Sequence, residues 1–299
     1  MNTERRPTLG EYQELWMATL LRRLPVSWTS AIGAYLGARR GRRGIAAKRL
    51  WVDRLHRNLD RLCPQQDPVE RERRIVAYTS RIGRLYAEYT VLQKIVREGR
   101  LDVVGLEHLQ GLSRPAILAS CHLGNWELVG YVLTLLDAPA FALYDPPQNP
   151  IRHRLATQAR LGWRSDFKVV PASPHAMRQL CKALASGCNL LMYVDEVKDG
   201  YLWAPSLGRR IPYSGNRWLT ARLAIRYQAD VLPVYVERIE GPRFRIMIAP
   251  KLVAVGEDDD ERACSLADQL DELLNTWIQS QPEHWHGLWE FDLDNPLPE

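Results

Sequence analysis

The chain has 299 residues, of which 46% are hydrophobic, 25% charged and 9% aromatic. These values are typical of a globular protein and exclude disordered, collagen-like and coiled-coil chains. The net charge of +5 is unevenly distributed, because residues 1–100 carry 21 basic against 10 acidic side chains and residues 101–299 carry 19 against 25.

The first hundred residues are predicted to be helical. Apolar residues recur at helical spacing in segments near residues 10–24, 28–38, 46–62 and 68–97, and prolines at positions 25 and 64 interrupt this pattern. We expect residues 1–98 to form a basic, membrane-associating helical region that packs on the rest of the protein.

After residue 99, short β-rich runs alternate with helical stretches. The expected strands are 102–105, 115–120, 141–144, 167–170, 189–194, 201–204, 231–237 and 244–249. The expected helices are at about 125–136, 149–161, 174–186, 214–228 and 261–280. Such alternation is typical of a parallel sheet. We therefore predict an α/β domain over residues 99–299, with a mixed, largely parallel sheet flanked by helices.

One junction between a strand and a helix carries the clearest chemical pattern. His122 follows the predicted strand 115–120. Gly124 and Asn125 supply a turn and a helix cap, which places Glu127 in the first helical turn. A neutral histidine can take a proton from a hydroxyl, and a carboxylate on its other nitrogen would orient it. The spacing predicts a general base, His122, oriented by Glu127.

Each part of this pattern also has a structural explanation. An acid in a first helical turn can simply complement the helix dipole, and a lone histidine at a strand end can be structural. Cys121 adjoins His122, but neighbours along a strand face opposite sides, which favours a buried thiol over a nucleophile. The motifs of serine nucleophiles, zinc hydrolases and nucleotide-binding loops are absent from the sequence.

Several stretches resemble, in order, the bacterial lipid A biosynthesis (late) acyltransferases of the lysophospholipid acyltransferase superfamily. CHLGNWE (121–127) fits the His-x4-Asp/Glu hallmark that follows a strand in that family. The other stretches are RRLPVSWTSAIGAYLG (22–37), AAKRLWVDRLHRNLDRLCP (46–64), YDPPQNP (144–150), VDEVKDGYLWAPSLGRRIPYS (194–214), TARLAIRYQADVLPVYVER (220–238) and PEHWHGLWEF (282–291). The resemblance covers nearly the whole chain.

The resemblance implies transfer of a fatty acyl chain from acyl carrier protein or coenzyme A to a hydroxyl of a lipid, such as a lipid A precursor. His122 would take the hydroxyl proton and Glu127 would orient His122. Arg160 or backbone N–H groups would stabilise the oxyanion, and the two alternatives stay open. The implied mechanism needs no metal, cofactor or covalent intermediate.

Further residues fall where the family is expected to bind substrate: Asn125, Asp195 and Ser214. Asp195 also has the simpler interpretation of a turn residue at the end of strand 189–194. Asp145 and Glu196 replace the Arg and Gln that are usual in the family, and the closing segment lacks its usual arginine pair. These departures put lipid A in doubt as the acceptor more than they affect the reaction.

The basic first third indicates how the protein would reach a lipid. Apolar and basic residues alternate there: Leu15, Trp16, Leu20, Leu21, Trp28, Ile32, Tyr35 and Leu36 beside Arg22, Arg23, Arg39, Arg40, Arg42 and Arg43. Such helices lie on anionic membranes. We expect peripheral attachment to the cytoplasmic face of the bacterial inner membrane. The alternative is that the apolar faces pack on the core. Nucleic acid is not expected, because no recognition motif accompanies the arginines.

The cysteines and the hydropathy agree with this expectation of peripheral attachment on the cytoplasmic side. The five cysteines include no Cys-x-x-Cys pair, and we expect reduced thiols in the cytoplasm. No run reaches the roughly 20 apolar residues needed to span a bilayer. Three alternative functions remain: acylation of a phospholipid, glycolipid or specialised lipid, a non-catalytic lipid-binding homologue, and a thioesterase-like hydrolase.

Overall fold

The computed structural model describes residues 8–64, 67–112, 115–145, 149–173 and 175–298. The first part is helical, as predicted: α1 (Leu9–Arg23), α2 (Val26–Ala46), α3 (Leu50–Leu62), α4 (Pro68–Glu88) and α5 (Leu92–Arg97). The single helix expected over 68–97 is wrong, because α4 ends at Glu88 and α5 begins after a turn. The helix expected over 28–38 continues to Ala46, although this extension contains two glycines, Gly41 and Gly44.

The predicted mixed, largely parallel sheet is confirmed. It has the order β1-β9-β8-β2-β5-β3-β4, and among its described strands only β8 and β9 pair antiparallel. The strands are β1 (Leu101–Val104), β2 (Ala116–Ser120), β3 (Ala140–Tyr144), β4 (Lys168–Pro171), β5 (Asn189–Tyr193), β8 (Asp230–Glu240) and β9 (Arg243–Ile248). A separate antiparallel hairpin joins β6 (Glu196–Lys198) to β7 (Tyr201–Ala204), and β6 was not expected from the sequence.

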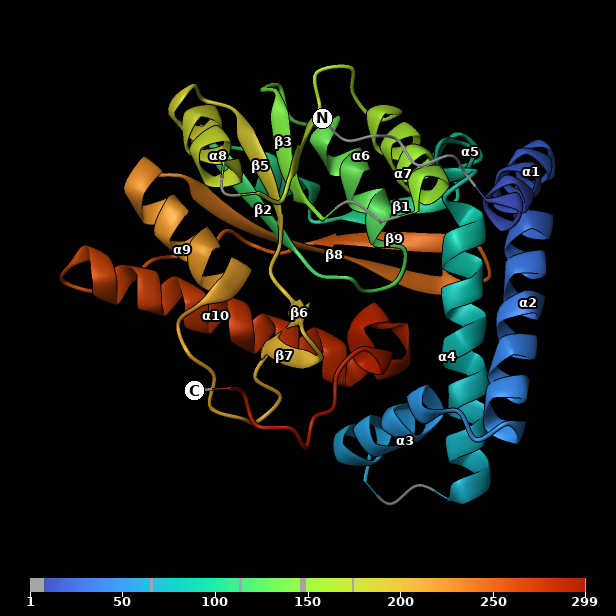
Figure 1. Ribbon diagram of the computed structural model, residues 1–299. Coiled ribbons are helices and arrows are strands. Elements are labelled where there is room, and N and C mark those ends of the chain that lie inside the picture. The colour runs from blue at the N-terminus through green and yellow to red at the C-terminus, as the bar shows by residue number, and fades with distance from the viewer. Residues whose placement is uncertain (1–7, 65–66, 113–114, 146–148, 174, 299) are drawn as a thin grey trace.

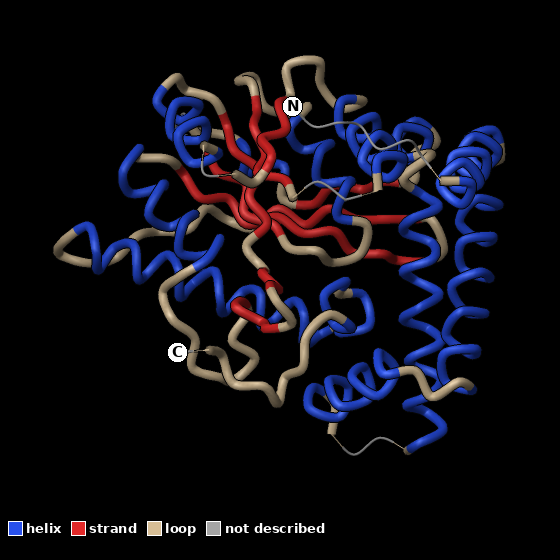
Figure 2. Tube along the Cα trace, viewed as in Figure 1, coloured by secondary structure: helices blue, strands red, loops and turns tan. Residues whose placement is uncertain are grey.

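Helices cover both faces of the sheet (Figures 1 and 2). Ile117 and Ala119 point to the face covered by α8 (Ala176–Ala185), α9 (Gly215–Tyr227) and α10 (Asp259–Ser280). Leu118 points to the opposite face, which is covered by α5, by η2 (Trp126–Val129) with α6 (Gly130–Leu133), and by α7 (Pro150–Leu161). This alternation of side chains along β2 gives the sheet two apolar faces, and each face needs its own helical layer.

The chain ends against the same framework. Short helical turns η1 (Leu106–Leu109), η3 (Pro282–His284) and η4 (His286–Trp289) complete the described elements. The two last turns follow α10 and bring the closing segment to α3 and α4, where Asn58 donates hydrogen bonds to the carbonyls of Leu288 and Phe291, each at 2.7 Å. The helical first third is therefore tied to the end of the chain. The boundary between residues 1–98 and 99–299 as separate domains stays a prediction.

The pairing of β2 with β5 determines where the site forms. These strands are parallel neighbours, with Ser120 opposite Tyr193. The ladder continues for one further bond, because the Val194 N–H donates to the Ser120 carbonyl at 2.8 Å. His122 and Asp195 both lie two residues beyond this last register pair. They emerge side by side at the carboxyl edge of the sheet, where ligands bind in open α/β folds.

The helices α2 and α4 pack with their backbones in contact, side by side along the molecule (Figure 1). A methyl group added to Gly33 would overlap the Gly83 carbonyl, and one added to Gly37 would overlap the Thr79 carbonyl. The spacing of four residues keeps these glycines on one helix face. Glycine is a poor helix former, so its repeated use in α2 reflects this close packing rather than local propensity.

We expect Gly37→Ala to lower the free energy of unfolding by about 1–3 kcal/mol, the usual cost of overpacking a tight contact. Denaturant unfolding followed by circular dichroism measures this change. The control is Gly10→Ala in α1, where no atom lies within 4 Å of the added methyl group. That substitution should leave stability unchanged or raise it by about 0.5–1 kcal/mol, since alanine is the better helix former. Equal effects at both positions would contradict the close-packing account.

Candidate active site

His122 is held by a carboxylate from the neighbouring strand. Its Nδ1 lies 2.9 Å from Asp195 Oδ1, and its backbone N–H donates to Asp195 Oδ2 at 3.0 Å. The Trp285 indole N–H also donates to Asp195 Oδ2, at 2.8 Å. Asp195 is buried, whereas the His122 side chain is 36% exposed. His122 Nε2 has no hydrogen-bond partner among the described residues and is the nitrogen left for a substrate.

This arrangement prepares His122 to accept a proton. Burial lowers the pKa of His122, but the charge and hydrogen bond of Asp195 outweigh it and leave the pKa above its ordinary value. Burial raises the pKa of Asp195, but the charge of His122 and the hydrogen bonds from His122 and Trp285 outweigh it, so the net shift is downward. The carboxylate therefore stays ionised and stabilises the imidazolium that proton transfer would form.

The expected hydrogen bond between Glu127 and His122 is wrong. Glu127 instead forms a bidentate ion pair with Arg160, at 3.0 Å from Nε to Oε2 and 2.6 Å from Nη2 to Oε1. Arg160 stands on α7 and also lies over the Tyr144 ring, 4.1 Å from its centroid. The negative charge of Glu127 still helps to raise the pKa of His122. Its hydrogen bonds go to the planar guanidinium of Arg160, because a carboxylate matches that group in geometry.

Three aromatic side chains surround the His122 imidazole. Tyr193 stacks on it with ring centroids 4.4 Å apart, and Trp126 meets it edge-on at 5.1 Å. The His286 ring lies 6.4 Å from that of His122 and 4.9 Å from that of Trp126. Burial and the proximity of His122 lower the pKa of His286 to about 3. His286 is therefore neutral at pH 7, and only His122 of the two carries a raised proton affinity.

The closing segment contributes residues that the sequence interpretation missed as site residues. Leu123 and Trp285 form an isolated antiparallel bridge, the His286 N–H donates to the His122 carbonyl at 2.9 Å, and Gly124 N–H donates to His284 at 3.0 Å. The aromatic run 282–291 was the signal for this contact. Nothing in its spacing indicated which turn it would cover.

Residues 8–290, nearly the whole chain, match the model of the bacterial lipid A biosynthesis acyltransferases. The chain belongs to this family. Membership implies acyl transfer to a lipid acceptor, so the protein is a transferase. No curated protein matches the sequence closely enough to add a nearer relative.

The other predicted site residues of this acyltransferase are placed as follows. Asn125 makes no side-chain cap for η2, so the expected cap is wrong; it is fully buried and donates to Glu88 Oε2 at 3.1 Å. Ser214 directly precedes α9 as its N-cap residue, and its N–H donates to the Pro212 carbonyl at 3.0 Å. These contacts do not join Asn125 or Ser214 to His122. Their roles toward substrate stay predictions.

Two smaller expectations can also be placed. Cys121 is fully buried, as predicted, and burial raises the pKa of its thiol well above the ordinary value. Asp145 is exposed, and residues 146–148 of the YDPPQNP stretch lie outside the described residues. None of the described helices is long and apolar enough to cross a membrane. Within the described ranges, no three His, Cys, Asp or Glu side chains gather as metal ligands would.

The pairing of His122 can be tested by its titration. We expect the pKa of His122 to lie above about 6.5 in the native protein and below it in Asp195→Asn, because burial then acts without the opposing carboxylate. NMR of the histidine Cε1–H resonance against pH measures both. Glu127→Gln is the control, and it should lower the pKa of His122 by less. A larger shift in Glu127→Gln than in Asp195→Asn would contradict the observed pairing.

Proposed function

We propose that the protein is an O-acyltransferase that moves a fatty acyl chain from an acyl thioester to a hydroxyl of a lipid acceptor. The donor is carried by acyl carrier protein or coenzyme A. The observation that carries this proposal is the His122–Asp195 hydrogen bond, which leaves Nε2 open at the carboxyl edge of the sheet. Family membership supplies the reaction class.

In the proposed step, His122 is the group that accepts the proton and later returns it. The acceptor hydroxyl gives its proton to His122 Nε2 while its oxygen attacks the thioester carbonyl. The carbon–oxygen ester bond forms, the carbon–sulfur bond breaks, and the departing thiolate takes the proton back from His122. Asp195 stabilises the intermediate imidazolium and holds the ring through both transfers. The bonds and protons of this step balance within the two substrates and His122.

We assign Glu127 a different role from the one its spacing indicated. Glu127 holds Arg160 in place through two hydrogen bonds, while Nη1 of Arg160 is buried without a hydrogen-bond partner among the described residues. A buried guanidinium N–H without a partner carries a desolvation penalty, so it is suited to donate a hydrogen bond to a substrate oxygen. This supports Arg160 as the donor to the developing oxyanion, in preference to backbone groups.

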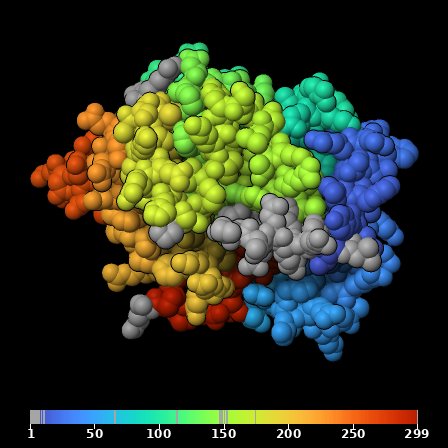
Figure 3. Space-filling view, turned by 45° about the horizontal axis from the view of Figure 1, so that its top comes forward, coloured from blue at the N-terminus to red at the C-terminus, as the bar shows by residue number. Residues whose placement is uncertain are grey.

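Membrane attachment belongs to the same proposal. On α1 and α2 several large apolar side chains are exposed, among them Trp16 at 79% and Trp28 at 65%. The set also contains Tyr12, Met17, Leu20, Tyr35 and Leu36. Leu21 packs inward, but these side chains do not pack on the core. Helices α1 and α2 form one side of the molecule (Figure 3). With the neighbouring arginines they support peripheral binding to the cytoplasmic face of the bacterial inner membrane.

Two alternatives are tested by the same experiments. A thioesterase would consume acyl thioester without an acceptor, whereas a lipid-binding homologue would bind acceptor and form no product. The partly exposed side chain of His122 and the raised pKa of this histidine favour an active enzyme over the second alternative.

We expect His122→Ala to lose roughly 10²–10⁴-fold of the acyl-transfer rate, the usual contribution of a general base. Purified protein, acyl-ACP or acyl-CoA, and a lipid extract provide the assay, with acylated lipid detected by mass spectrometry. The control is His175→Ala, an exposed histidine at the start of α8, which should keep the native rate. Full activity in His122→Ala would refute the mechanism. Release of free fatty acid without any acylated lipid would indicate a hydrolase.

Membrane binding is tested separately from turnover. Trp16→Ala/Trp28→Ala is expected to bind anionic vesicles several-fold more weakly, because two large apolar side chains no longer enter the interface. Vesicle sedimentation at low salt measures the bound fraction. Val253→Ala/Val255→Ala removes apolar groups that are equally exposed but lie outside α1 and α2, and should leave binding unchanged. Equal binding of neutral and anionic vesicles by the native protein would contradict the proposed attachment.

A further inference from the structure

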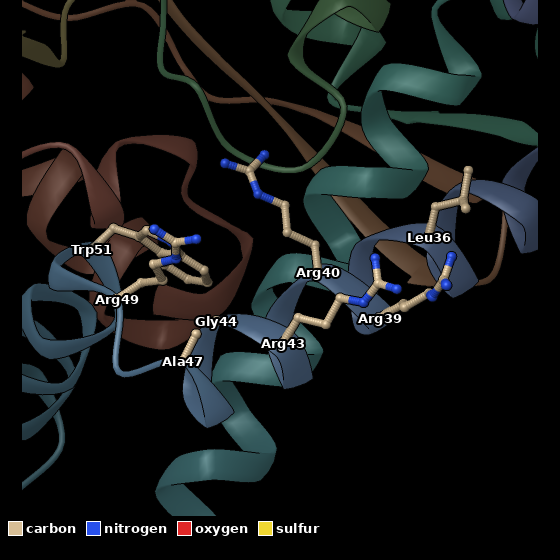
Figure 4. A pocket seen from close by; sticks show the side chains of 8 residues that line it. All are labelled: Leu36, Arg39, Arg40, Arg43, Gly44, Ala47, Arg49 and Trp51. Carbon is tan, nitrogen blue, oxygen red and sulfur yellow. The ribbon is translucent and has the colours of Figure 1, made fainter.

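A groove of about 580 Å³ lies between the second half of α2 and the start of α3 (Figure 4). Arginines dominate its lining: Arg39, Arg40, Arg43 and Arg49, together with Leu36 and Trp51. No acidic residue lines the groove, and none of the four arginines forms an ion pair with another described residue. All four arginines are exposed, so their guanidinium groups are accessible to an anion, and an anion bound among them would offset the repulsion between their like charges.

The groove continues an apolar face of α2. Trp28, Tyr35, Arg39 and Arg43 fall within one narrow face of the helix, at spacings of seven and four residues. The first two are 65% and 64% exposed. Along this face the surface is therefore apolar in the first half of the helix and cationic in the second. A matching ligand has apolar chains at one end and negative charge at the other.

The groove also adjoins the candidate active site. The Arg40 guanidinium lies 4.9 Å from the centroid of the Trp289 ring. The Trp289 ring lies 6.3 Å from that of His286, which is one of the rings around His122. In Figure 4, Arg40 extends away from Arg39 and Arg43. A ligand anchored at the arginines would therefore have its remaining atoms within reach of the catalytic residues.

We propose that this arginine groove binds the phosphate of the acceptor lipid's headgroup, which rests on the proposed function for the identity of that lipid as acceptor. A phosphate monoester carries up to two charges and three acceptor oxygens, and guanidinium groups bind it in bidentate fashion. The apolar half of α2 then receives the acyl chains. An acidic carrier protein needs no concave groove and no adjoining apolar face, so it fits these observations less well.

The experiment compares vesicles of equal surface charge. Phosphatidylcholine vesicles contain either phosphatidic acid, which supplies a phosphate monoester, or oleate, which supplies a carboxylate. The native protein should bind the phosphatidic acid vesicles at least tenfold more tightly, because a charge-assisted bidentate bond is worth about one power of ten in affinity. In Arg39→Gln/Arg43→Gln this preference should disappear.

Arg23→Gln/Arg42→Gln is the matched control. It removes the same charge from exposed positions of α1 and α2 that do not line the groove. Both double variants should lose the same general attraction to anionic vesicles, but only the groove variant should lose the preference for phosphate. Calorimetry with inorganic pyrophosphate separates the sources of phosphate: binding of pyrophosphate that is weaker than that of the lipid supports a headgroup site.

Three outcomes would overturn the proposal. One is equal binding of the two vesicle types by the native protein, and another is equal loss of preference in both double variants. The third is loss of binding to acyl carrier protein in Arg39→Gln/Arg43→Gln while the preference for phosphatidic acid remains. His122→Ala should retain the phosphate preference. The vesicle assay therefore tests phosphate binding in the groove, whereas the catalytic proposal is tested only by the rate of acyl transfer.

Discussion

The parallel pairing of β2 with β5 is the constraint on which the site depends. It places His122 and Asp195, 73 positions apart in sequence, at one edge of the sheet, where two hydrogen bonds join them, one to the imidazole and one to the backbone N–H of His122. Trp285 then binds the second carboxylate oxygen and brings the closing segment over the same turn. The strand pairing and the hydrogen bonds to Asp195 together fix the orientation of the His122 ring. Such a fixed orientation suits the proton transfer that we propose for His122.

A second buried network ties the turn after His122 to the helical first third. Glu88, fully buried on α4, pairs with Arg238 of β8 at 2.7 and 2.8 Å and also accepts hydrogen bonds from Ser30 and Asn125. Removing one partner of such a pair costs about 3–5 kcal/mol, because the other charge stays buried. The network joins α2, α4, β8 and the turn after His122. Hydrogen bonds thus connect helix α2, which bears part of the exposed apolar surface, to the turn that carries His122.

Periodicity and alternation predict most of this fold. The strand runs after residue 99 all form strands, and the position of Asp195 at a strand end predicts that it shares an edge with His122. The contact of the closing segment could not be predicted, because it depends on how α10 directs the chain. The glycines of α2, spaced every four residues at 33, 37 and 41, carry a signal for helix packing.

His122 pairs with Asp195 instead of the expected Glu127, and this difference follows from the charges that must be neutralised at the site. Local spacing places Glu127 near His122, but it does not predict the contact with Arg160, which lies on α7. The Arg160 side chain is mostly buried, with 17% of it exposed. If Glu127 turned to His122, that guanidinium would lose both its charge-assisted bonds. A neutral imidazole demands no such partner until it is protonated. Arg160, which is always charged, therefore pairs with Glu127, and His122, whose charge depends on pH, pairs with Asp195 at the end of the neighbouring strand.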